Sequence, residues 1–247
     1  MARAGEEIYN PRQKDRVVFL QTARETDGQL LRLEMFASPG AAPPPEHVHP
    51  RQEERFETVS GVLRASVGGE ERSLRAGESM VVPPGTPHTW WIDGEEDAHV
   101  LVEFRPALNT ETFFETMYGL ARDGKVDENG VPPFLQTAVI SSAYEIYLPR
   151  PPIAMQKALF ALLVPVGKLM GYGASYPEYS GTDAPAMDGP GPGRSRRAGI
   201  VAAVGAGLLA FALVRRRAGR RWAPYRRPRK ISNFRERTVR AREFATR

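Results

Sequence analysis

The chain has 247 residues, of which 41% are hydrophobic and 26% are charged, values typical of a globular protein with a core. It contains no cysteine, which excludes disulfides, thiolate metal sites and thiol catalysis, so histidine or carboxylate side chains must hold any metal. The net charge of +5 is uneven: residues 215–247 hold 14 Lys or Arg and two acids (+12), which leaves 20 basic and 27 acidic residues (−7) before them.

The first half of the chain has the pattern of a β protein. The opening residues 1–16 contain no apolar run, so we expect no secretory signal peptide there. From residue 16 to 106, short segments rich in β-branched and aromatic residues alternate with Gly-, Pro- and Asp-containing breaks, as in RVVFLQ, QLLRLEMF, RFETVS and HVLVEF. We therefore predict a mainly β fold, an antiparallel jelly-roll β-barrel over residues 16–106.

A helical annex is predicted over residues 107–172. The segment TETFFETMYGLARDGK has apolar residues at helical spacing, with Thr110 as the N-cap and Phe113, Phe114 and Met117 facing inward. Two further helices are expected in PFLQTAVISSAYEIYL and IAMQKALFALLVPVGKLMGY. The Gly- and Pro-rich stretch that follows, residues 173–197, is predicted to be a flexible linker.

Residues 198–214 contain no charged side chain and are bounded by arginines on both sides, which predicts one transmembrane helix. An Ala- and Gly-rich helix buried in a soluble fold is the alternative. The basic tail, residues 215–247, is expected to contact an anionic membrane surface; nucleic acid is the rival partner, but no DNA-binding motif accompanies the charge. Because nothing precedes the barrel to direct export, its default location is the cytoplasmic side of the membrane.

Two histidines, His47 and His49, lie one residue apart, and Glu54 follows five residues after the second. Residues two apart on a strand point to the same face, and Pro50 favours an extended residue before it. Glu54 can return to that face after the intervening turn. Two imidazoles and one carboxylate form the ligand set of a facial metal triad.

A second stretch, GESMVVPPGTPHTWW, places His88 at the start of a strand, just after a tight turn at Gly85. If this strand runs antiparallel to the one carrying His47 and His49, His88 completes a set of three histidines and one glutamate. Such a set leaves open positions on an octahedral metal for water, dioxygen or a chelating substrate. His99 lies outside both motifs, and Glu53 and Glu57 are interpreted as solvated charges.

These motifs resemble those of the cupins, a family of small jelly-roll barrels. His47, His49, Glu54 and Gly61 match the first cupin motif in type and spacing, although Gly40 is one residue too far away to open it. The second motif is matched by Gly77, Pro83, Gly85 and His88, whereas Ile92 occupies its Asn position. The barrel followed by an annex with the stretch YPEYSG also resembles uncharacterised bacterial cupin-domain proteins. The resemblance implies bound Fe, Mn, Ni or Zn, and a homodimer.

Strand alternation proposes a wall for a ligand pocket beside the metal. If His88 points inward, then Trp90 and Ile92 do so too, while Trp91 points away. Phe56 shares the inward face with Glu54. We therefore predict Phe56, Trp90 and Ile92 as substrate-binding residues; the alternative is that they are only barrel core.

Three functions are compatible with the sequence. The first is a metal-dependent enzyme acting on a small molecule, with an oxygenase as the leading specific case and an isomerase as another that the cupin resemblance allows. The second is a ligand-binding or sensing module located at the membrane. The third is a protein that acts through its basic tail and uses the barrel as a scaffold.

Overall fold

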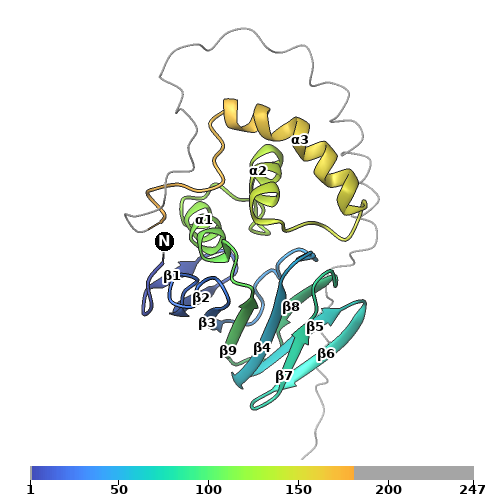
Figure 1. Cartoon of the computed structure of the whole chain (residues 1–247). Coiled ribbons are helices and arrows are strands. Elements are labelled where there is room, and N and C mark those ends of the chain that lie inside the picture. Colours follow the sequence, from blue (N-terminus) through green and yellow to red (C-terminus); the bar gives the residue numbers. More distant parts are fainter. Residues whose placement is uncertain (1, 181–247) are drawn as a thin grey trace, which may run out of the picture. The chain divides into compact units, whose positions relative to one another are not determined.

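The computed structural model describes residues 2–180 of the chain. Within them the strands form two sheets in which every pair is antiparallel, a larger one in the order β1-β2-β3-β9-β4-β7 and a smaller one in the order β6-β5-β8 (Figure 1). The strands are β1 Glu7–Asn10, β2 Asp15–Gln21, β3 Leu31–Ala37, β4 Glu53–Ser60, β5 Val62–Val67, β6 Glu70–Arg75, β7 Ser79–Val82, β8 His88–Ile92 and β9 Ala98–Arg105. The predicted antiparallel β architecture is confirmed.

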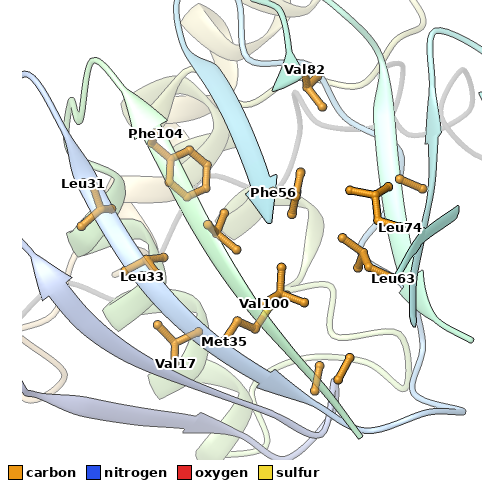
Figure 2. Packing of buried hydrophobic residues seen from close by; sticks show 14 of the residues in the cluster. Val17, Leu31, Leu33, Met35, Phe56, Leu63, Leu74, Val82, Val100 and Phe104 are labelled. Carbon is orange, nitrogen blue, oxygen red and sulfur yellow. The ribbon is translucent and has the colours of Figure 1, made fainter. Parts of the chain in front are cut away.

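One hydrophobic cluster fills the space between the two sheets. Along β2 and β3, buried residues alternate with half-buried ones, as expected for strands with one face on the core. Figure 2 shows Leu63 and Leu74 of the smaller sheet facing Phe56 and Val100 of the larger one. Burying one such side chain contributes about 1.5–3 kcal/mol, so this cluster is the main source of stability for the barrel.

Up to residue 180, three helices follow the strands: α1 Thr110–Arg122, α2 Phe134–Tyr144 and α3 Ile153–Leu169. They lie at one end of the two sheets, and α3 packs against α2 (Figure 1). The N-terminal boundary of the barrel also differs from the prediction, since β1 begins at Glu7 and the expected start was residue 16. Its four residues, EIYN, carry too little hydrophobic pattern to reveal a strand.

Helix α1 faces the core as predicted, because Phe113, Phe114 and Met117 pack against hydrophobic clusters, but its N-cap and its most buried positions differ. Asn109, not Thr110, occupies the N-cap position, and no side chain caps the helix. Phe113, Phe114 and Met117 are only half-buried, whereas the fully buried positions include Tyr118 and Gly119. Because α1 packs on two sides, against the barrel and against the chain that returns after α3, apolar spacing identifies residues that contact the core but not those that are buried most deeply.

The segment 173–180 is packed on the helices and is not a flexible linker, so the predicted linker begins too early. The Gln136 side chain donates a hydrogen bond to the carbonyl of Gly173 (2.6 Å) and accepts one from the Tyr176 hydroxyl (2.8 Å). The Tyr179 ring lies on Gly119, where a Cβ would be 2.2 Å from the ring. The contacts of Tyr176 with Gln136 and of Tyr179 with Gly119 hold this segment against the helices, although its Gly- and Pro-rich composition predicts flexibility.

The predicted membrane helix over 198–214, the basic tail over 215–247 and the rest of the predicted linker lie outside the described residues. Among residues 2–180, no helix has both the length and the apolar character needed to cross a bilayer. The segment that forms α3 carries Lys157, Lys168 and Pro165 within its 17 residues.

A buried Asp15 gives the barrel a predictable pH dependence. Burial raises the pKa of Asp15 to about 7, against a smaller lowering by the hydrogen bond from the Tyr118 hydroxyl. The folded chain therefore keeps this proton up to a higher pH than the unfolded chain, whose Asp pKa is near 3.8. This group should cost about 4 kcal/mol of stability as pH rises from about 4 to about 7, because one pKa unit corresponds to about 1.4 kcal/mol.

Asp15→Asn should remove that loss, since the amide cannot ionise and its oxygen still accepts from Tyr118. Urea unfolding at a series of pH values across this range measures the effect. Asp93→Asn, at an exposed aspartate that pairs with Arg64 at 3.7 Å, is the matched control. Parallel pH profiles for Asp15→Asn and the wild type would contradict the assignment.

Candidate metal centre

Backbone hydrogen bonds join the two histidine motifs. The His47 amide donates to the carbonyl of His88, and the His88 amide donates to that of His47, each at 2.9 Å. The amide of Gly85, in the turn before β8, donates to the carbonyl of His49 at 2.8 Å. This antiparallel bridge is the pairing predicted for the two motifs, and it brings residues far apart in the sequence onto one side of the barrel.

The four predicted ligand residues come together at one point. One donor atom from each of His47, His49, Glu54 and His88 lies within 4.8 Å of the other three. The Glu54 carboxylate is 2.7 Å from Nε2 of His88 and 3.6 Å from Nε2 of His49. The imidazole of His47 is 4.3 Å from that of His88 between ring centroids. The site is largely enclosed, since all but His47 are buried.

Two of the imidazoles are oriented by carbonyl groups. Nδ1 of His47 lies 2.8 Å from the carbonyl of Pro45, and Nδ1 of His88 lies 3.0 Å from the carbonyl of Thr86. A carbonyl can only accept, so each Nδ1 carries the proton and each Nε2 is left as the donor atom for a metal. Among the described residues, the buried Nδ1 of His49 has no hydrogen bond of normal length and angle.

The electrostatics of the cluster favour neutral imidazoles at two positions. The pKa of His47 is lowered to about 3, mainly by desolvation and then by the charges of His88 and His49. The pKa of His49 is also lowered to about 3, mainly by desolvation and then by the charge of His88. The Gln52 side chain has a smaller effect that raises this pKa. For His88, desolvation is outweighed by the hydrogen bond and charge of Glu54, which raise its pKa. His47 and His49 therefore keep a free lone pair at neutral pH.

The donor set fits a divalent transition metal. Three imidazole nitrogens and one carboxylate suit Fe, Mn, Ni or Zn. Cu(I) is a poorer match because the site has no thiolate, and Ca²⁺ is a poorer match because the site has a single carboxylate. One negative charge from Glu54, in a buried place, offsets half the charge of such a cation. The geometry and chemistry of the residues present are thus compatible with the predicted cofactor.

Sequence reasoning missed the residues that hold the histidine segment against the annex. Val48 pairs with Tyr147 through two backbone hydrogen bonds of 2.8 and 3.1 Å, and Arg51 forms an ion pair with Glu145. The buried amide of Gln52 donates to the carbonyls of Pro106 and Ala107 and to the hydroxyl of Thr110, at 2.7–3.0 Å. These contacts join segments far apart in the chain, so no local pattern could have indicated them.

The predicted pocket residues divide between core and partial exposure. Phe56 and Ile92 belong to the buried hydrophobic cluster, whereas Trp90 is half-buried and packs against it. Trp91 lies under the guanidinium of Arg64, 5.5 Å from the ring centroid. Beside the metal-ligand candidates, the ring of Phe104 packs edge-on against the ring of His49, with 5.9 Å between the ring centroids. Phe104 lies in the segment HVLVEF, which was predicted to be a strand, but nothing in that pattern singled out Phe104 as a neighbour of the histidines.

The remaining candidate side chains lie away from the cluster. His99 pairs with Glu34 at 2.6 Å and stacks on Phe36, 4.4 Å between ring centroids. Glu57 pairs with Arg55 at 2.8 Å. The four-residue cluster does not include Glu53 or Glu57. Of the acids near the first motif, Glu54 therefore has the place expected from its spacing to Gly61.

Comparison with known proteins agrees with this architecture. The family described as Cupin domain matches residues 33–104, which contain both motifs, and this match supports the cupin superfamily for the barrel. An RmlC-like cupin from Shewanella frigidimarina is 22% identical, with 42% of this chain and 86% of that chain covered and a TM-score of 0.37.

Two curated relatives carry names that state an activity. An oxidoreductase from Arthrobotrys oligospora is 27% identical over 151 residues, which cover 56% of this chain and 59% of that protein. The probable oxidoreductase virH of Hypocrea virens is 28% identical over 196 residues, which cover 71% of this chain and 87% of that protein. The chain thus spans about three fifths of the Arthrobotrys protein. The expected likeness to bacterial proteins with a C-terminal membrane segment finds no support among these relatives.

Proposed function

We propose that this protein is a metal-dependent oxidoreductase, with oxygenase chemistry on a small molecule as the specific form. The observation that carries the proposal is the convergence of three imidazoles and one carboxylate within 4.8 Å in a buried part of a cupin barrel. A divalent metal held there would supply a Lewis acid or redox centre with open positions for an oxygen-bearing ligand. The names of the two relatives agree with this class of reaction.

The residues of the chain have distinct roles in this proposal. His47, His49 and His88 offer Nε2 atoms, two of them oriented by carbonyl groups, and Glu54 offers a carboxylate oxygen. The ring of Phe104 and the burial of the cluster keep bulk water away from the donor atoms, which strengthens their electrostatic interactions. The two backbone hydrogen bonds between Val48 and Tyr147 hold the first motif in place, so that the donor atoms are preorganised before any ion binds.

The test is whether the metal has an open position. The full chain would be loaded anaerobically with Fe(II), and nitric oxide would be added as a stand-in for dioxygen. The expected result is the electron paramagnetic resonance signal of an iron–nitrosyl species, lost in the His47→Ala/His49→Ala double variant. Full metal loading without that signal would mean a closed, structural site, and the enzyme proposal would be abandoned in favour of a binding or structural module.

Substitution of Trp90 tests whether the predicted residues line a ligand pocket. Phe56 and Ile92 are too deeply buried in the barrel core for a clean substitution, whereas Trp90 is half-buried and packs at its edge. We expect Trp90→Ala to weaken binding of a small ligand several-fold while metal content is unchanged, because the side chain is proposed to contact the ligand and not the ion. Ligand affinity by calorimetry and metal content by elemental analysis provide the two readouts.

Trp91→Ala is the control, since that side chain points away from the cluster and lies against Arg64. Equal loss of ligand and metal in Trp90→Ala, or loss of neither, would argue against a role in the pocket. The location of the protein at a membrane through residues 198–214 and 215–247 stays a prediction from sequence.

A further inference from the structure

One nitrogen atom of the histidine cluster lacks a regular hydrogen-bond partner. His49 is buried, and its Nε2 lies 3.6 Å from the Glu54 carboxylate, on the side of the metal centre. Its Nδ1 points in another direction and, among residues 2–180, makes no hydrogen bond of normal length and angle. Buried polar atoms are rarely left unpaired in folded proteins, so a partner for this atom is expected among the neighbouring side chains.

The other two histidines indicate what Nδ1 of His49 requires. Nδ1 of His47 faces the carbonyl of Pro45, and Nδ1 of His88 faces the carbonyl of Thr86. A neutral imidazole carries its proton on one nitrogen only, so each of these acceptors keeps the proton on Nδ1 and leaves Nε2 free to bind a metal. Without an acceptor at Nδ1, a fraction of the His49 side chains would carry the proton on Nε2 and could not bind through that atom.

Gln52 is the side chain that acts on His49. It follows His49 by three residues and is buried. Desolvation and then the charge of His88 lower the pKa of His49, whereas a side-chain hydrogen bond with Gln52 raises it. A group that accepts a hydrogen bond from the protonated ring has an effect in this direction. Since Nε2 faces Glu54, the contact with Gln52 belongs to Nδ1, although its length or angle lies outside the normal range.

The orientation of the Gln52 amide is set by the connection between β9 and α1. Its Nε2 donates to the carbonyls of Pro106 (2.8 Å) and Ala107 (3.0 Å) and to the hydroxyl of Thr110 (2.7 Å). The two carbonyls can only accept, so an inverted amide would bring its oxygen against two other oxygens. The nitrogen therefore faces the connection, and Oε1 is the arm of the amide that remains to accept a hydrogen bond.

We propose that Gln52 is the positioning residue of His49: its Oε1 accepts a hydrogen bond from Nδ1–H of His49, so that Nε2 keeps the lone pair for the metal. All three histidines would then have an oxygen at Nδ1, supplied by two carbonyls and one side chain. The same amide would link this ligand to the start of α1. The importance of this role rests on the proposed metal centre, but the position of the proton on His49 is a property of the chain before any metal is added.

The sequence favours a direct test by nuclear magnetic resonance, because the chain has only four histidines. The full chain would be labelled with ¹⁵N-histidine, kept free of metal with a chelator and studied at pH 8. Long-range ¹H–¹⁵N correlations distinguish a protonated ring nitrogen from one with a free lone pair, and His49→Ala assigns the signals of His49. Zn(II) titration of the same samples measures metal affinity separately.

In the wild type we expect the proton of His49 on Nδ1, with a nuclear Overhauser effect from that proton to the Gln52 side chain. Gln52→Met keeps the length of the side chain but removes its acceptor. It should move a substantial fraction of the His49 protons to Nε2 and weaken Zn(II) binding about 10-fold, while the tautomers of His47 and His88 stay as in the wild type.

Two further variants separate positioning from a purely structural role. Thr110→Val removes one partner of the amide but leaves Oε1, so it should lower the urea midpoint without changing the His49 tautomer or Zn(II) affinity. Gln52→Glu loses the bonds to the two carbonyls but still offers an acceptor, so it should keep the proton of His49 on Nδ1 in a less stable chain.

A wild-type His49 with its proton on Nε2, or the same tautomer in Gln52→Met as in the wild type, would overturn the proposal. If Gln52→Met fails to fold, the wild-type tautomer and its Overhauser effect to Gln52 decide the outcome. A chain with the expected tautomers that binds no Zn(II) would refute the metal centre and leave the contact between Gln52 and His49 standing.

Discussion

Replacing Glu54 by Gln is expected to lower metal affinity by at least about 100-fold, since changes even in outer-shell partners of metal ligands typically cost about 10- to 100-fold. The substitution keeps the shape of the side chain but removes the only negative charge in the cluster. A divalent cation would then lie among neutral donors in a buried place, where an uncompensated charge is costly. The His88 Nε2 atom, 2.7 Å from Glu54, would also lose its charged partner.

Elemental analysis of the purified full chain, followed by metal titration, measures this effect. The wild type should hold close to one equivalent, and Glu54→Gln and the His47→Ala/His49→Ala double variant should hold little. His99→Ala is the matched control, because this histidine pairs with Glu34 away from the cluster and its loss should leave metal content unchanged. A wild-type chain that takes up no metal even after reconstitution would refute the metal centre and leave a ligand-binding or structural barrel.

The second large effect is on stability and concerns Gly61. This residue connects β4 to β5, where the chain leaves the larger sheet for the smaller one, and it has φ +76°. A Cβ there would lie 2.7 Å from the Cα of Ala98 and 2.8 Å from the carbonyl oxygen of Asp97. Both obstacles are backbone atoms at the start of β9, so neither can rotate away as a side chain could.

We expect Gly61→Ala to destabilise the fold by about 2–5 kcal/mol, the sum of a left-handed backbone (about 1–2 kcal/mol) and overpacking (about 1–3 kcal/mol). Gly77→Ala is the control, because Gly77 has a similar φ of +85° but open space at its Cβ position, so only the backbone cost of about 1–2 kcal/mol applies. Urea unfolding followed by tryptophan fluorescence compares the two variants. Similar midpoints for both would show that the contact with Ala98 relaxes at little cost.

The sequence by itself indicated most of the strands and the four residues that come together at the candidate site. Alternation with a period of two identifies core-facing residues wherever one sheet face is buried, which is why β2, β3 and β9 could be predicted locally. The spacing of His47, His49 and Glu54, together with the turn before His88, likewise follows from strand geometry. Each inference needed only the distance along one strand or one turn.

The tertiary structure decided what depends on two segments meeting. The buried face of α1 is set by packing against both the barrel and Tyr179, so Phe113 and Phe114 are less buried than their spacing suggested. Residues 173–180 of the predicted linker are held to α1 and α2 by Tyr176 and Tyr179, although their composition favours flexibility. The partners of Gln52 and the exposure of Leu162 on α3 also arise from contacts between distant segments, which a local pattern does not encode.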